Sequence, residues 1–126
     1  MKWLFPAFLF SFATVCHAQQ QQQTVDVLKM RDNFIVASIA AQKCKSGDSS
    51  KQDSHDRNFT ILSRRASQIL AARSPNIAPE ELRKQDLAHI EKLQDETFNL
   101  LQNEGCKSDK VKALLRMHRV HETIRF

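Results

Sequence analysis

The sequence predicts an all-α protein, an antiparallel up-down four-helix bundle with one disulfide. Apolar residues recur three and four positions apart in four separate segments, which is the spacing of one helix face. No run alternates apolar and polar residues as a half-buried strand does, and the whole chain has only two glycines. Two of the three cysteines, in addition, fall where two helix ends would meet in such a bundle.

The first 18 residues are typical of a secretory signal peptide. Lys2 precedes a 13-residue apolar run, and the small residues Cys16 and Ala18 fit the positions before a cleavage site. The run is shorter than the roughly 20 residues that a membrane-spanning helix needs. We therefore expect cleavage near Ala18, no membrane anchor, and a periplasmic or secreted product.

The remaining 108 residues are enough for one domain. The run Gln19–Gln23 is polar and of low complexity, so we expect a disordered tail before a bundle over residues 24–126. A first helix is predicted from about Val25 to Lys45. Its stretch from Phe34 to Ala41 is apolar nearly all round, as in the most buried helix of a bundle, and Gly47 is the expected stop.

Three more helices are predicted after a polar loop over residues 46–56. The second runs from about Arg57 to Arg73 on the spacing of its apolar residues. The third begins near Pro79, a residue preset for a first helical turn, and ends at Gly105. Ser108 or Asp109 is expected to cap the fourth, which continues to about Ile124.

Cleavage of the signal leaves Cys44 and Cys106, and an even number of cysteines in an exported protein favours a disulfide. Cys44 ends the first predicted helix and Cys106 follows the third. In an up-down-up-down bundle these ends lie at the same pole, so the bridge requires no distortion. We expect this disulfide to be structural.

Catalytic motifs are absent from the sequence: no nucleophile-elbow pattern, zinc-protease pattern or phosphate-binding glycine loop occurs. We therefore expect a protein that is not an enzyme and needs no cofactor. An exported helical domain of this size would act by binding a protein partner. The roles we consider are an immunity protein against a toxin, an accessory of a secretion or conjugation system, and a chaperone.

The second and fourth predicted helices are basic, which favours a partner with an acidic surface. Export and the lack of Tyr or Trp in the mature chain argue against nucleic acid, since bases have no aromatic platform on which to stack. The candidate partner-binding residues are Arg64, Arg65, Lys112, Arg116 and Arg119.

The alternative function is a carrier of haem or a divalent metal. His118 and His121 lie three apart, so both rings can face one way on a helix, and Met30 would share their end of the bundle. Axial Met and His ligands on the first and last helices would resemble the small periplasmic four-helix b-type cytochromes. The resemblance is one of length and helix order, and it implies Met30, His118 and His121 as ligands.

Two further patterns leave alternatives open. The apolar spacing from Leu87 to Leu101 fits the bundle core, and a homodimer formed through an edge helix is the other interpretation. Asn58-Phe59-Thr60 is an N-glycosylation sequon, which matters only in a eukaryotic secretory pathway.

Overall fold

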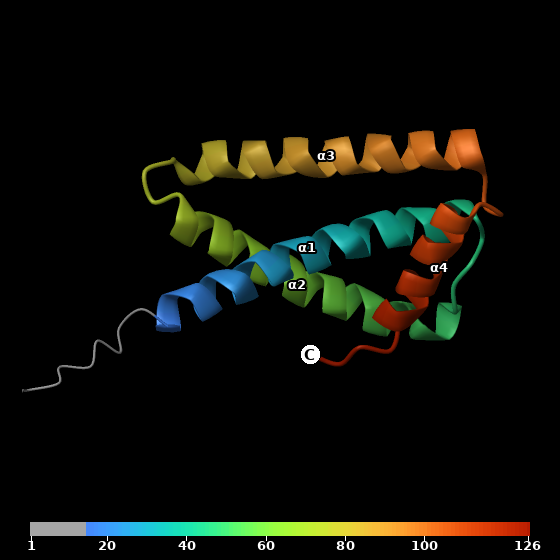
Figure 1. The fold of residues 1–126 in the computed structure, drawn as a ribbon, viewed down its shortest axis with the longest axis horizontal. Coiled ribbons are helices and arrows are strands. Elements are labelled where there is room, and N and C mark those ends of the chain that lie inside the picture. The colour runs from blue at the N-terminus through green and yellow to red at the C-terminus, as the bar shows by residue number, and fades with distance from the viewer. Residues whose placement is uncertain (1–14) are drawn as a thin grey trace, which may run out of the picture.

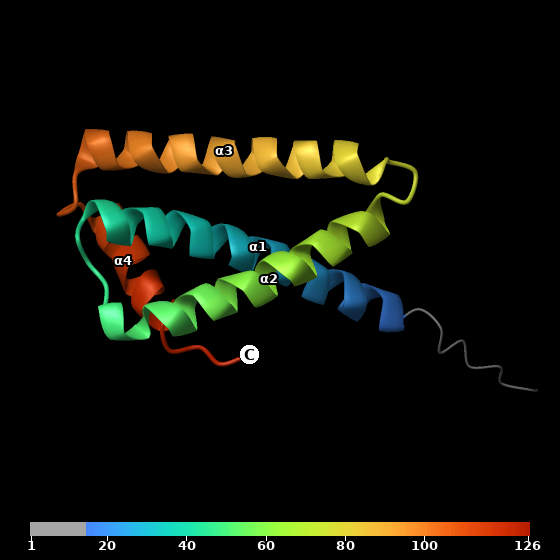
Figure 2. The ribbon, with the colours of Figure 1, turned by 180° about the vertical axis from the view of Figure 1, so that it is seen from behind.

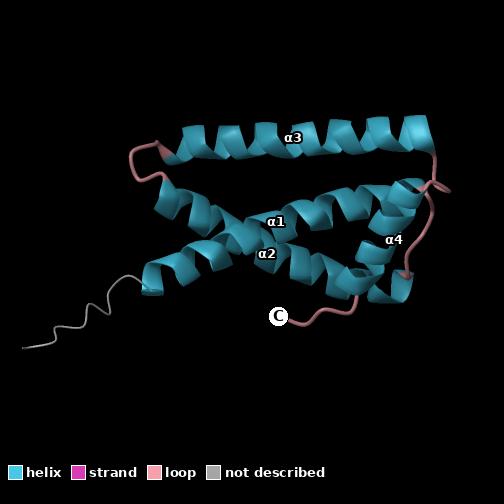
Figure 3. Ribbon diagram, viewed as in Figure 1, coloured by secondary structure: helices cyan, strands magenta, loops and turns pink. Residues whose placement is uncertain are grey.

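The computed structural model describes residues 15–126, with side chains from Asp26 onward. Four α-helices follow one another: α1 Val15–Lys43, α2 Gln52–Arg73, α3 Pro79–Glu104 and α4 Asp109–His121. A short 3₁₀ turn, η1 Ser49–Lys51, leads into α2. The described part of the chain contains helices and loops and no strand (Figure 3). The predicted all-α bundle with one disulfide is confirmed.

Helix α1 is the central element and contacts each of the other three helices. It crosses α2, which runs in the opposite direction, while α3 lies along the other side of α1 and returns in the direction of α1 (Figure 1). The short α4 lies across the end of α1 where α3 finishes, and the reverse view shows the same order (Figure 2). A layer of helices therefore surrounds α1, and the core lies along its length.

The core is built mainly from the middle of α1, as the apolar stretch from Phe34 to Ala41 predicts. Phe34, Ala37 and Ala40 are completely buried, and they are joined by Leu62 of α2 and Val111 of α4. The small alanine side chains allow neighbouring helices to approach α1 closely, while Phe34 fills the space between them. Helix α3, by contrast, buries only Thr97, so it acts as a cover with one face toward α1.

The helix ends follow the sequence in three places and differ at others, including the end of α4, which is His121 rather than Ile124. Ser108 caps α4, with its Oγ accepting a hydrogen bond from the Val111 amide at 3.2 Å. Pro79 occupies the first turn of α3 and Gly105 follows its last residue. Helix α2, however, begins at Gln52 rather than Arg57, so part of the expected loop is helical.

The end of α1 also differs, because Lys45 rather than Gly47 takes the left-handed conformation, with φ +50°. The Ser46 amide donates to the Ala41 carbonyl at 2.8 Å, and the Lys45 amide to that of Gln42 at 3.3 Å. This is the paired hydrogen bonding of a Schellman motif, which usually has glycine at the left-handed position. Gly47 instead lies against the side chains of His118 and Glu122.

At its other end α1 begins at Val15 and therefore runs through Gln19–Gln23, where the sequence predicts a disordered tail. Glutamine is a good helix former, so a helix nucleated by the buried stretch can extend through this run. Residues 1–14 of the expected signal peptide lie outside the described residues. Between Val15 and Phe126 no helix is long and apolar enough to cross a membrane.

Two contacts fasten α3 to α1. The disulfide Cys44–Cys106 joins their ends, with 5.7 Å between the Cα atoms, so the predicted pairing is confirmed. Some three turns before Cys44, the buried Arg31 donates to Asp86 of α3 at 2.8 Å and to its neighbour Asp32 at 3.3 Å. His89 of α3 lies 2.8 Å from the other oxygen of Asp32. A covalent bond and an ionic network thus hold α1 and α3 together at two points.

Candidate functional site

The most unusual feature of the molecule is a group of three buried histidines, which we call the histidine cluster: His55 of α2 with His118 and His121 of α4. The His121 ring stacks on Phe34 of α1, with centroids 3.7 Å apart and planes 10° apart. The His55 ring lies 5.3 Å from Phe34 and 4.8 Å from His118. Each histidine is at least nine-tenths buried, so three titratable side chains take core positions at one end of the bundle.

Helical spacing explains why these rings meet. Val111, His118 and His121 are the buried residues of α4, and they recur at intervals that bring them to one face. On α2 the buried residues His55, Asn58, Leu62 and Ala66 form a similar stripe. Both stripes turn toward α1, so the histidines continue the apolar faces of their helices.

Glu122 ties the cluster to the loop between α1 and η1. Its Oε1 lies 3.3 Å from His118 Nδ1 and accepts a hydrogen bond from the Asp48 amide at 3.0 Å. Gly47 lies against both groups, because a Cβ atom there would be 3.5 Å from Glu122 Oε1 and 3.5 Å from His118 Cε1. Gly47 also has φ +133°, a conformation that side chains disfavour. A Cβ at these distances would make ordinary van der Waals contact, so the positive φ, rather than lack of space, favours glycine at residue 47.

Asn58 fixes the chain beyond α4. Its side-chain amide donates to the Ile124 carbonyl at 2.7 Å and to the His121 carbonyl at 3.4 Å. Farther along, the Arg65 guanidinium lies 5.8 Å from the centre of the Phe126 ring, within reach of a cation–π contact. The C-terminal segment thus runs along α2. With Asn58 buried in these contacts, its place in the sequon is not on an open surface.

Burial keeps two of the histidines neutral at pH 7. Burial first, and then the positive charge of His55 and His118, lowers the pKa of His121 to about 4. The pKa of His118 is also lowered, first by burial and then by His55, while Glu122 partly opposes the shift. His121 Nδ1 is buried and has no hydrogen-bond partner, so a proton added there would find no acceptor.

His55 also contacts a hydroxyl and a carboxylate. Ser38 Oγ of α1 lies 3.0 Å from His55 Nε2, and both residues line a polar pocket of about 230 Å³. Asp56 Oδ1 is 3.4 Å from His55 Nδ1, but it accepts a shorter bond of 2.7 Å from Gln52, and the Asp56 side chain is 64% exposed. A hydrolytic triad needs a buried carboxylate that orients the imidazole. Here the hydroxyl instead supplies the partner that a buried imidazole requires.

The alternative function suggested by the sequence is a haem or metal carrier with Met30, His118 and His121 as ligands. Among the residues whose placement is described, no group of three or more His, Cys, Asp or Glu side chains lies where it could hold a metal ion. Met30 is half-buried one turn before Phe34 on α1. His118 and His121 both lie on the buried face of α4, where the His118 ring contacts His55 and the His121 ring contacts Phe34. His55 was missed, although its spacing from Asn58 and Leu62 continues a helix face and would have identified it.

The candidate partner-binding residues are all exposed. Arg64 and Arg65 lie midway along α2, and Lys112, Arg116 and Arg119 follow one another at intervals of four and three along α4. Other surface cations pair locally, as Arg83 with Glu80 and Lys110 with Glu104. Within the described part of the chain Lys112, Arg116 and Arg119 form no ion pair, so α4 presents a row of three unpaired positive charges, which we call the basic row.

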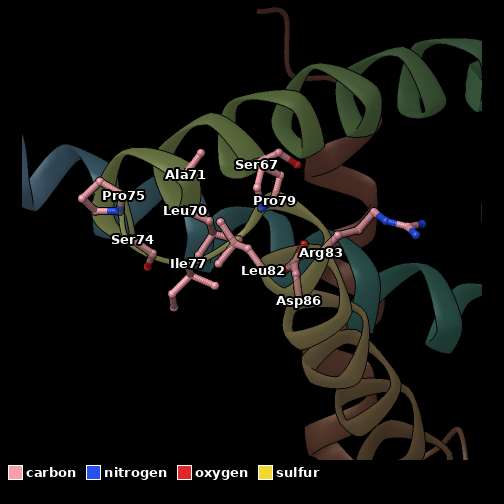
Figure 4. Close-up of a pocket in the computed structure, with 10 residues that line it drawn as sticks. All are labelled: Ser67, Leu70, Ala71, Ser74, Pro75, Ile77, Pro79, Leu82, Arg83 and Asp86. Carbon is pink, nitrogen blue, oxygen red and sulfur yellow. The ribbon is translucent and has the colours of Figure 1, made fainter.

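An apolar groove of about 420 Å³ lies at the opposite end of the bundle, where α2 turns into α3. Leu70 of α2, Ile77 of the turn and Leu82 of α3 point toward one another in it (Figure 4). Asp86 also lines the groove, but its carboxylate is engaged by the buried Arg31. The groove therefore offers apolar contact and little fixed charge.

Comparison with known proteins gives no assignment for any of these sites. The chain matches no protein-family model, no curated protein and no solved structure.

Proposed function

We propose that this chain is an exported, non-enzymatic protein that acts by binding a protein partner with an acidic surface. The basic row on α4 is the observation that carries the proposal. Lys112, Arg116 and Arg119 share one exposed face and form no ion pair with any of the described residues. Such a row attracts an acidic surface during encounter and fixes the register of the complex.

The surroundings of the basic row support the same assignment. Arg119 also lines a surface hollow of about 380 Å³ together with Lys51, Asp48 and Glu122, beside the histidine cluster. The hollow adjoins the basic row and can receive a side chain of the partner. Because His118 and His121 anchor the inner face of α4, the outer face is held rigidly, which lowers the entropy lost on binding.

The disulfide agrees with an exported protein, since such bonds persist in oxidising compartments. In a periplasmic or extracellular setting, the roles that fit a small rigid binder are toxin immunity, assistance to a secretion or conjugation system, and chaperone action. All three need a stable complex with another protein, and none needs a catalytic group.

Native mass spectrometry of the protein purified gently from its own host tests the proposal. We expect the mass of residues 19–126 less two hydrogens, with an added protein in fixed stoichiometry. The variant K112E/R116E/R119E should lose that added protein. The matched control reverses three exposed cations of α3 and should retain it: R83E/K84E/K92E.

Two outcomes would contradict this assignment. A partner that both triple variants retain would place the interface away from α4. An added haem or metal ion in place of a protein would instead support the alternative, a carrier using Met30, His118 and His121, and its loss in H118A or H121A would identify the ligand.

A further inference from the structure

We propose that the histidine cluster is an acid-sensitive switch that releases the end of α4 and the following C-terminal segment from α1 and α2. The inference rests on the packing of the cluster and does not depend on which partner the basic row binds. Three imidazoles from two helices meet in one buried site, so any proton added there is placed beside other titratable rings. Of the three, only His118 has a carboxylate that shares its buried site, that of Glu122.

The charged groups around the cluster make added protons costly to keep buried, which favours release of the end of α4. Helix α1 contributes Phe34 and Ser38, which carry no charge. Glu122 can balance one proton, while Asp56 beside His55 is exposed and engaged by Gln52. The remaining charged groups line the two adjoining pockets. Three of them are cations, Lys45, Lys51 and Arg119, and one is an anion, Asp48. Two or more added protons would thus face one buried carboxylate and a positive surround, and charges without such compensation are costly to bury.

The architecture confines the change to one end of α4. The helix has only 13 residues and is the last of the four described helices, and its release leaves the contacts of α1 with α2 and α3 in place. Its start is held through the short connection from Cys106, which is bonded to Cys44. Its end is held by the ring stack on Phe34, the Asn58 bonds to the His121 and Ile124 carbonyls, and the Glu122 bond to the Asp48 amide. Loss of these contacts allows the end to swing about a start that is covalently fixed.

The size of the response follows from His121. With a pKa of about 4 in the closed state and 6.5 for a free imidazole, its protonation increases the opening equilibrium roughly 30-fold between pH 7.5 and pH 5. His118 shifts in the same direction and adds to this factor. A histidine with an unperturbed environment would contribute nothing, because closed and open states would bind the proton equally.

Hydrogen–deuterium exchange on the exported protein with its disulfide intact provides the test. After correction for the intrinsic pH dependence of exchange, peptides covering residues 109–126 should lose protection about 30-fold or more from pH 7.5 to pH 5. Peptides covering α3 should change little. Unchanged protection over residues 109–126, or an equal loss across all four helices, would overturn the proposal.

A pair of variants separates the cluster from other acid effects. His121→Phe keeps an aromatic ring to stack on Phe34 but cannot take a proton, so most of the acid response should disappear. His89→Phe makes the same change on α3, where His89 is about half exposed, and should respond as the natural protein does. An undiminished response in H121F would refute the switch. Should H121F fail to fold, the pH series of the natural protein still decides the question.

Discussion

Reduction of the Cys44–Cys106 bond is the perturbation whose effect can be worked out most directly from the fold. The two cysteines are 62 residues apart and join the end of α1 to the chain just after α3. Both helices are otherwise held by one apolar face and by the Arg31 network. The bond therefore closes a loop that contains two whole helices, and its removal enlarges the ensemble of unfolded conformations.

The relation between loop length and entropy gives the magnitude. A loop closed over 62 residues corresponds to about 4 kcal/mol at 25 °C. A domain of this size has a free energy of unfolding of roughly 5–15 kcal/mol, so reduction should remove a large part of it. Cys106 is exposed, which makes the bond accessible to a soluble reductant without prior unfolding.

Urea unfolding followed by far-ultraviolet circular dichroism, with and without reductant, measures the effect. The midpoint should fall by about 2 M in the reduced protein, given a slope of about 2 kcal/mol per M. The variant C44S/C106S should match the reduced protein and be insensitive to reductant. Equal midpoints for the oxidised and reduced protein would refute the reasoning, because they would mean that the bond does not restrict the unfolded chain.

Three further predictions concern single sites. Asp86→Ala leaves the buried Arg31 with Asp32 alone and should cost about 3–5 kcal/mol, measured as a lower urea midpoint, whereas an unchanged midpoint would show that Asp32 suffices. Leu62→Ala opens a cavity against α1 and should cost about 2–5 kcal/mol in the same assay; a loss below 1 kcal/mol would mean that the helices close the space. The folded-state pKa of His121 is depressed, so above pH 6.5 its contribution to stability is complete and it is lost as pH falls toward 4. Global stability from urea titrations should therefore fall by about 3 kcal/mol over that range from His121 alone, and a flat profile would contradict the buried neutral imidazole.

Much of the fold could be predicted from the sequence because it follows from local rules. Helical spacing located all four helices. Cys44 and Cys106 both lie at the carboxyl end of a helix, and this position predicted that the two ends meet at the same pole of the bundle. The start of α2 was missed because the polar residues before Arg57 resemble a loop. Their helical state depends on tertiary contacts of His55 and Asn58, which a local pattern does not reveal.

The site was predicted less completely than the fold. His118 and His121 were identified as a pair, but only as ligands of the alternative haem or metal carrier. The stacking of His121 on Phe34 depends on how α4 lies across α1, which no residue type specifies (Figure 1). The burial of Arg31 was missed for a similar reason. A cation can be buried on α1 because it pairs with Asp86, which belongs to another helix.

The central place of α1 has a consequence for the order in which the molecule is made. Synthesis delivers α1 before any of the helices that cover it, and α4, which completes the enclosure of Phe34, comes last. During that interval the apolar stretch from Phe34 to Ala41 has no native partner and is open to non-native contacts. The partner of Cys44 is likewise made late, so oxidation can fix the native topology only after both α2 and α3 have been synthesised.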